Sequence, residues 1–194
     1  MVELIFVRHG RIDSNVRRAY CGQTDRELDA EGVRQAQGAR DRLKEIKLDG
    51  IFASPLKRTL KTAQIINEFH KIDIAPSESI MEQNFGIWED CTWEEICTRN
   101  PEEAKYWRDD WKDYCMEKGE SSRQVHERNA GFIDGLLERH KSGTFLIVTH
   151  LGCIRHLLAH LLGMGMEGFW RFQAGNCAII RVAVNDEGFA HLYL

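Results

Sequence analysis

The feature that most constrains the fold is a short apolar run, residues 4–7, that stops on Arg8, His9 and Gly10. A buried run of this length that ends in glycine predicts an interior strand followed by a tight turn. In open α/β sheets, ligands bind at the carboxyl ends of the strands, where this turn would hold Arg8 and His9. A guanidinium group is a forked cation suited to phosphate, and a neutral imidazole can be a nucleophile, base or ligand near pH 7. The turn therefore suggests a phosphate handled by a histidine, although a histidine at a strand end is more often only hydrogen-bonded.

Two later apolar runs end on residues of the same kind. Residues 50–53 lead into a Ser-Pro pair at 54–55, which predicts an N-cap, proline at the first helical position, and Arg58 in the first helical turn. A cation is unfavourable there, so a bound anion explains Arg58 better than helix stability does, and a solvent-facing side chain is the alternative. Residues 145–149 are apolar and β-branched, predict a central strand, and stop on His-Leu-Gly at 150–152.

The remaining residues alternate between helical and strand-like patterns. Helical spacing is found in residues 29–47, 54–69, 124–139 and 154–162, and short strand-like runs in residues 72–74, 178–184 and 189–194. With the runs above, this order predicts an α/β fold, a three-layer sandwich whose mostly parallel sheet has an antiparallel edge strand. We expect a single domain over residues 1–194, with a helical insertion at about residues 92–117.

The three strand ends predict one shared site. Because the carboxyl ends of parallel strands lie on the same side of a sheet, His9, Arg58 and His150 should converge there together with Arg8. Two guanidinium groups and two imidazoles would give a dense set of donors for a phosphate dianion. The loop that carries Glu82 can reach the same rim.

The composition argues against several other classes of protein. A net charge of −4 disfavours a general nucleic-acid binder, so a local cluster of cations must attract any anion. Six scattered cysteines without a CxxC pair indicate neither a zinc site nor a disulfide framework. No run approaches the ~20 apolar residues of a membrane span and no leader precedes the first strand, so we expect a cytoplasmic protein that binds no membrane. His156 and His160 could share a metal, but ordinary helix histidines are the favoured interpretation.

The predicted insertion carries a stripe of tryptophans. Trp107 and Trp111 recur at helical spacing, which most often marks a face packed on the core. The alternative is a lid that contacts the substrate. Glu89, just before the insertion, could be a second acid or a structural carboxylate that caps the following helix.

Five motifs, in this order and spacing, resemble those of the histidine phosphatase superfamily, also called the phosphoglycerate mutase-like family, over essentially the whole chain. The motifs are Arg8-His9-Gly10 with Asn15, Gly22-x-x-Asp25-x-x-Leu28-x-x-x-Gly32, Ser54-Pro55-x-x-Arg58, Glu82-x-x-Phe85-Gly86-x-Trp88-Glu89, and Thr149-His150-x-Gly152. Within the superfamily, the short length and the segment 82–89 look most like the α-ribazole phosphatase branch of cobalamin synthesis.

The resemblance implies a role for each matching residue. His9 would be the nucleophile that becomes phosphorylated, and Glu82 would be the proton donor. The residues expected to bind the phosphate or the rest of the substrate are Arg8, Asn15, Gln23, Arg58, His150 and Leu151. Two positions depart from the family pattern. Arg11 replaces the usual glutamate and would add positive charge near the mouth, and Leu151 replaces a small residue and would narrow the mouth.

Elementary chemistry is compatible with these roles without a metal or another cofactor. Hydrolysis of a phosphate monoester is among the slowest uncatalysed reactions, so the site must stabilise the transferring charge strongly. The arginines and a protonated His150 could do so in place of a metal ion while His9 attacks in line. The same cations would lower the pKa of His9 and keep it neutral.

Three functions remain open on the sequence. The favoured one is a metal-independent phosphomonoesterase for a small phosphorylated metabolite. The first candidate substrate, by resemblance, is α-ribazole 5′-phosphate, with Trp107 and Trp111 as a stacking surface for its base. A phosphoglycerate mutase is disfavoured because the short chain leaves little room for a substrate-enclosing insertion. A catalytically dead protein that binds a phospho-ligand is disfavoured because it would not need both His9 and Glu82. The sequence leaves a homodimer open.

Overall fold

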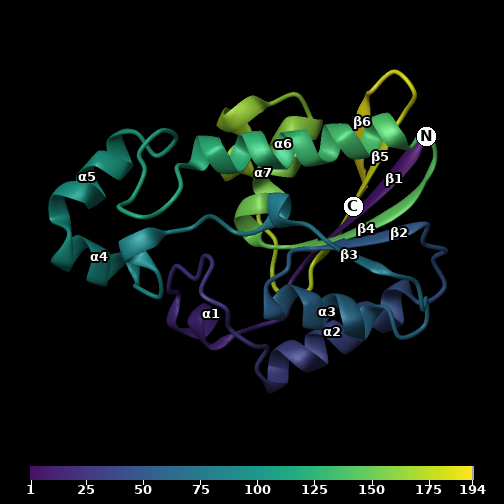
Figure 1. The fold of residues 1–194 in the computed structure, drawn as a ribbon, viewed down its shortest axis with the longest axis horizontal. Helices are drawn as coiled ribbons and strands as arrows, with labels where there is room; N and C mark the ends of the chain where they lie inside the picture. Colours follow the sequence, from purple (N-terminus) through teal and green to yellow (C-terminus); the bar gives the residue numbers. More distant parts are fainter. Residues whose placement is uncertain (194) are drawn as a thin grey trace.

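Six strands form one mixed sheet at the centre of the computed structural model, which describes residues 1–193 (Figure 1). The strands are β1 (Val2–Arg8), β2 (Gly50–Ala53), β3 (Ile74–Pro76), β4 (Gly143–Thr149), β5 (Ile179–Val184) and β6 (Ala190–Tyr193), in the spatial order β3-β2-β4-β1-β5-β6. The first four of these in space are parallel, β5 is antiparallel to β1, and β6 is antiparallel to β5. The expected sheet is confirmed; the last residue of its expected final strand, Leu194, lies outside the described residues.

Helices cover both faces of this sheet and extend beyond it at one end (Figure 1). They are α1 (Asp13–Arg17), α2 (Ala30–Leu43), α3 (Lys57–Ile66), α4 (Trp93–Arg99), α5 (Pro101–Asp109), α6 (Ser122–Arg139) and α7 (Leu151–Leu161), with short 3₁₀ turns η1 (Glu78–Ile80), η2 (Gly86–Trp88) and η3 (Gly165–Arg171). Over the part of the chain that the structure describes, none of the helices combines the length and the apolar character that crossing a bilayer requires.

The apolar run that opens the chain serves both faces of the sheet. Leu4 and Phe6 pack among residues of α6 and α7, whereas Ile5 and Val7 pack among residues of α2 and α3. Successive side chains of a strand point to opposite faces, so a strand that is covered on both faces must be apolar at every position. This is why β1 is a continuous apolar run and not an alternating one.

Side-chain caps start three of the helices, but Ser54 does not cap the helix that follows it. The side chain of Asp29 caps α2, and capping boxes start α4 at Thr92 and α6 at Ser121. The prediction that Ser54 caps the next helix is wrong, because α3 begins only at Lys57 and the Ser54 hydroxyl pairs with an imidazole of the site. Local capping chemistry has been replaced there by a tertiary contact, while Arg58 keeps its expected place in the first turn.

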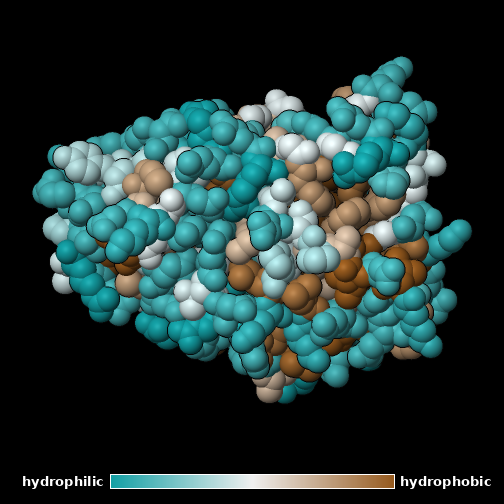
Figure 2. Space-filling model, viewed as in Figure 1, coloured by the Kyte–Doolittle hydropathy of each residue, from teal (hydrophilic) through white to brown (hydrophobic). Residues whose placement is uncertain are grey.

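The predicted insertion consists of α4, α5 and the loop that leads to α6. A separate small core of Trp88, Ile96, Ala104 and Met116 holds it together. Figure 2 shows mostly hydrophilic residues over α5 and α6, whereas apolar residues gather around β3 and α3. β3 is a three-residue edge strand, and its own Ile74 as well as Leu60 of α3 are only partly buried.

Candidate active site

The three strand ends converge as predicted. His9 directly follows β1, Arg58 lies in the first turn of the helix after β2, and His150 directly follows β4. The centroids of the His9 and His150 rings are 5.2 Å apart, and the Arg58 Nε lies 3.3 Å from the His150 Nδ1. Segments separated by more than 90 residues of sequence therefore meet at one point because β2, β4 and β1 are adjacent parallel strands.

His9 has the geometry of a nucleophile. Its Nδ1 lies 2.8 Å from the carbonyl oxygen of Gly10. A carbonyl oxygen can only accept, so Nδ1 carries the proton and Nε2 keeps its lone pair. Burial and the positive charges of Arg58 and Arg8 hold the pKa of His9 well below its usual value, so the ring is neutral near pH 7.

Arg8 offers donors that the protein does not use. Its Nη1 donates to the carbonyl oxygen of Ala174 at 2.7 Å, whereas its buried Nε has no hydrogen-bond partner among residues 1–193. A buried donor without a partner costs free energy comparable to a lost hydrogen bond. The cavity beside Arg8 and His9 is consequently suited to an anionic oxygen.

Arg58 is fully buried and satisfied by the protein itself. Its guanidinium group donates to the carbonyl oxygens of Gly22 and Thr24, the latter at 2.9 Å, as well as to His150. The solvent-facing alternative for Arg58 is therefore wrong. The sequence suggested a bound anion as the partner of Arg58; in the structure, backbone carbonyl oxygens accept hydrogen bonds from its guanidinium group.

Glu89 holds the same loop from the other side. Its carboxylate accepts the backbone N–H groups of residues 22–24 and of Phe85, together with the hydroxyl of Thr24, at 2.7–3.1 Å. Residues 22–24 thus lie between an anion that takes their N–H groups and Arg58, which donates to two of their C=O groups. Of the two interpretations of Glu89, the structural carboxylate fits this arrangement, although it orders a loop and does not cap the next helix.

His150 is held in one tautomer by its two neighbours. The Arg58 Nε can only donate, so the His150 Nδ1 accepts and its Nε2 carries the proton, which points to the Ser54 Oγ at 2.8 Å. Burial and the charge of Arg58 hold the pKa of His150 well below its usual value. The expected protonated His150 is therefore a neutral imidazole in this structure.

Glu82 is fixed at the N-terminus of α7. Its Oε2 accepts the N–H of Gly152 at 3.1 Å, and its Oε1 accepts the N–H of Gln83 at 3.0 Å. A side chain at position 152 could not coexist with this geometry, because its Cβ would lie 2.3 Å from the Glu82 Oε1. The positive end of the helix dipole adds to the stabilisation of the carboxylate.

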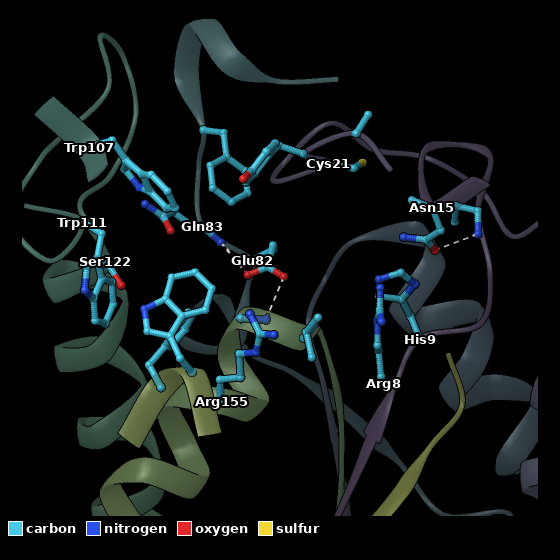
Figure 3. A pocket seen from close by; sticks show the side chains of 18 residues that line it. Arg8, His9, Asn15, Cys21, Glu82, Gln83, Trp107, Trp111, Ser122 and Arg155 are labelled. Carbon is cyan, nitrogen blue, oxygen red and sulfur yellow. Dashed lines mark hydrogen bonds between the residues drawn. The ribbon is translucent and has the colours of Figure 1, made fainter. Parts of the chain in front are cut away.

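Arg8, His9 and Glu82 line a cavity of about 240 Å³, hereafter the cavity, whereas the buried Arg58 and His150 do not line it and reach it only through their contact with His9 and with each other. Pockets for drug-sized ligands range from about 300 to 1,000 Å³, so this volume suits a small metabolite. Figure 3 shows Arg8 and His9 on one side, Trp107 and Trp111 on the other, and Glu82 with Arg155 between them. The aromatic rings that line the cavity belong to Tyr20, Phe85, Trp107, Trp111, Phe169 and Trp170.

Some other predicted site residues line the cavity and some do not. Asn15 and Leu151 line it, and the Asn15 Oδ1 accepts from the Ile12 N–H. Gln23 does not line the cavity; its Nε2 donates to the carbonyl oxygen of Glu82 at 3.2 Å. The charge expected from Arg11 is paired with Asp29 at 2.7 Å, so it adds little to the field at the mouth.

Trp107 combines both interpretations that the sequence left open, because it packs against Trp88 in the core of the insertion and also lines the cavity. Trp111 lines the cavity and packs against Phe169 and Trp170. The cavity therefore includes residues from the insertion.

Sequence reasoning missed Arg155, which lines the cavity and is 9% exposed. It stands within a helix that is otherwise apolar and buried over Cys153–Ala159 apart from His156. A charged residue in such a run is rare without a partner or a function, and this signal was readable in the sequence. His156 itself pairs with the cavity-lining Ser122 at 3.2 Å, and His160 pairs with Asp134 at 2.8 Å. Within residues 1–193, no three side chains of metal-binding type are grouped to hold an ion.

Known proteins are similar to this chain in sequence and in fold. A phosphoserine phosphatase 1 of Hydrogenobacter thermophilus is 33% identical over 178 residues, which cover 92% of this chain and 84% of that protein. A protein of Proteus mirabilis named as a probable phosphoglycerate mutase is 34% identical, over 94% of this chain and 85% of its own length. The crystal structure of the α-ribazole phosphatase of Shigella flexneri superposes with a TM-score of 0.93 at 28% identity, covering 99% of this chain and 95% of that one.

These relatives are named phosphatases or mutases, in agreement with the phosphatase that the motifs predict. Residues 4–194 match the family described as the histidine phosphatase superfamily, branch 1. The chain therefore belongs to the histidine phosphatase superfamily.

Proposed function

We propose that the protein is a metal-independent phosphomonoesterase that acts through a phosphohistidine at His9. The observation that carries the proposal is the neutral tautomer of His9, whose unprotonated Nε2 belongs to a ring that lines the cavity beside the unpaired Nε of Arg8. The anchored carboxyl group of Glu82 lines the same cavity and supplies an acid for the leaving group.

The reaction has two balanced steps. In the first, the His9 Nε2 attacks phosphorus in line, the P–O bond to the organic group breaks, and Glu82, which is protonated beside the bound phosphate dianion, gives its proton to the departing oxygen. In the second, the Glu82 carboxylate takes a proton from water, the water oxygen attacks phosphorus, and the P–N bond breaks. Phosphate leaves and His9 returns to its neutral form.

The cationic groups stabilise the phosphoryl group during transfer. Arg8 lines the cavity and has an unpaired Nε, and Arg58 contributes its charge beside His9 while it orients His150. Donors and charges that are already in place when the reaction starts require no reorganisation, which is the most effective form of electrostatic catalysis. Arg8, Arg58 and His150 are accordingly proposed as the phosphate-handling set.

A direct assay tests the reaction. Phosphate release from an aryl phosphate should proceed in the presence of EDTA, and brief mixing with substrate should leave a phosphoryl group on the protein that is labile in acid. His9→Ala should abolish turnover and labelling. Glu82→Gln should slow alkyl phosphates by about 10²- to 10⁴-fold and an aryl phosphate with a good leaving group far less. Equal slowing of both esters would argue against Glu82 as the proton donor.

The mutase and the binding protein make different predictions. A mutase would convert 3-phosphoglycerate in the presence of its bisphosphate primer faster than it releases phosphate. A binding protein would show no turnover of any ester.

For the substrate, the resemblance supports α-ribazole 5′-phosphate as one ester to assay. A carboxylate-bearing ester is the other candidate, and Arg155 is the observation that favours it.

A further inference from the structure

We propose that Arg155 selects the substrate by binding a carboxylate on its organic part, so that the preferred esters are phosphorylated hydroxy acids or hydroxy amino acids. This inference rests on the proposed phosphomonoesterase reaction and specifies its substrate class.

Arg155 presents an unused fork of donors to the cavity. Within residues 1–193, the hydrogen bond of its guanidinium group runs from Nε to the carbonyl oxygen of Phe172 at 2.9 Å, and neither terminal nitrogen has a partner. The two terminal nitrogens of a guanidinium group match the two oxygens of a carboxylate in a bidentate pair. Within residues 1–193, no hydrogen bond or ion pair joins Glu82 to Arg155: the Glu82 oxygens accept the N–H groups of Gly152 and Gln83, and its negative charge acts on Arg155 only at longer range.

Aromatic rings hold the guanidinium group in place. Its central carbon lies 5.2 Å from the ring centres of both Phe169 and Trp170. Trp170 in turn packs on Trp107 and Trp111, with ring centroids 6.2 and 5.4 Å apart. The tryptophans that suggested a stacking surface for a base therefore pack on one another and support an arginine. A fork held in this way loses little conformational entropy when a ligand binds.

The position of Arg155 fits the organic part of an ester. In Figure 3, Arg155 lies next to Glu82, between Arg8 and His9 on one side of the cavity and Trp107 and Trp111 on the other. The ester oxygen must be close to Glu82 when it receives its proton, so the organic group attached to that oxygen begins beside Arg155. A carboxylate on this group would reach a cation, whereas the organic part of α-ribazole 5′-phosphate carries no anion.

Two pairs of substrates isolate the carboxylate. Phosphoserine differs from phosphoethanolamine only by its carboxylate, and 3-phosphoglycerate differs from glycerol 3-phosphate by a carboxylate in place of a hydroxymethyl group. A charged hydrogen-bonded pair is worth about 1.5–3 kcal/mol, so kcat/KM should favour the carboxylate member by roughly 10- to 100-fold in the wild type.

The variant Arg155→Gln should lower the ratio of kcat/KM between the two members of each pair to nearly one, mainly by slowing the carboxylate member. Arg155→Lys, which keeps the charge without the fork, should retain part of the preference. Arg171→Gln removes an exposed arginine from η3 nearby and is the matched control, which should keep the wild-type preference.

The inference is overturned if the wild type shows no preference in either pair, if Arg155→Gln keeps the preference, or if it slows both members of a pair equally. The last outcome would mean that Arg155 acts through Glu82. If the wild type does not hydrolyse an aryl phosphate at all, the proposed phosphomonoesterase reaction is refuted instead. The two failures are therefore distinguishable.

Discussion

Replacement of Gly152 by alanine would test the role of Glu82 without touching Glu82 itself. The new Cβ would lie 2.3 Å from the Glu82 Oε1, whereas ordinary contact begins near 3.4 Å, so the carboxylate must retreat by about 1.1 Å. The displaced atom is the far end of a flexible side chain, so the move costs little stability. Alanine also favours a helix over glycine by about 1 kcal/mol. We therefore expect a free energy of unfolding within about 1 kcal/mol of the wild type.

Activity should respond much more strongly than stability. A misplacement of about 1 Å in a reacting group can cost on the order of 10²-fold in rate. Gly152→Ala should therefore lower kcat/KM for an alkyl phosphate by about 10²-fold, and for an aryl phosphate with a good leaving group by much less, because that group departs without a proton. Urea unfolding and steady-state assays on the two esters give both readouts.

Two other helical glycines provide matched controls. A Cβ at Gly38 in α2 or at Gly131 in α6 would meet no atom within 4 Å. Alanine there should raise stability by about 0.5–1 kcal/mol and leave both activities unchanged. If Gly152→Ala hydrolyses the alkyl ester as fast as these controls do, Glu82 is not the proton donor, or its position does not matter.

Two further predictions follow from the buried polar groups. Glu89→Gln should lower the free energy of unfolding by about 2–4 kcal/mol, because several N–H groups lose a charged acceptor. The variant should also hydrolyse all esters more slowly and to the same degree, because the carbonyl partners of Arg58 move. A variant that is as stable and as active as the wild type would contradict this account. Burial lowers the pKa of His9 and His150 well below 6.5 and that of His156 to about 3, so each takes up a proton on unfolding once the pH falls below about 6.5. As the pH falls below about 6.5, the free energy of unfolding should decrease by about 1.4 kcal/mol per pH unit for each of these histidines. Urea unfolding at a series of pH values measures this dependence, and a free energy of unfolding that does not change with pH in this range would mean that the rings are charged in the folded state.

The sequence specified the fold and the centre of the site because both depend on short-range signals. A strand buried on both faces must be apolar throughout, so β1 and β4 were visible as runs, and the polar residues that interrupted them marked the strand ends. His9 and His150 each follow one of these strands, so the parallel arrangement of β1 and β4 is enough to predict that the two rings lie close together.

The errors arose where a side chain has a distant partner. Ser54 has the local chemistry of an N-cap, yet its hydroxyl pairs with His150, which lies 96 residues later. Arg11 was expected to add positive charge near the mouth, but it pairs with Asp29, which lies 18 residues later. No pattern of neighbouring residues contains such contacts.

The way in which Arg58 is buried has a consequence for the field inside the protein. Its N–H groups are satisfied by peptide carbonyls and an imidazole, which are dipoles, and not by a carboxylate, which would cancel its charge. The N–H groups of the loop at residues 22–24, whose carbonyl groups accept from Arg58, donate to the carboxylate of Glu89 on the other side of the loop. The positive charge of Arg58 therefore acts directly on its neighbour His9, whose pKa it lowers, and it would stabilise the negative charge of a phosphoryl group transferred to that ring.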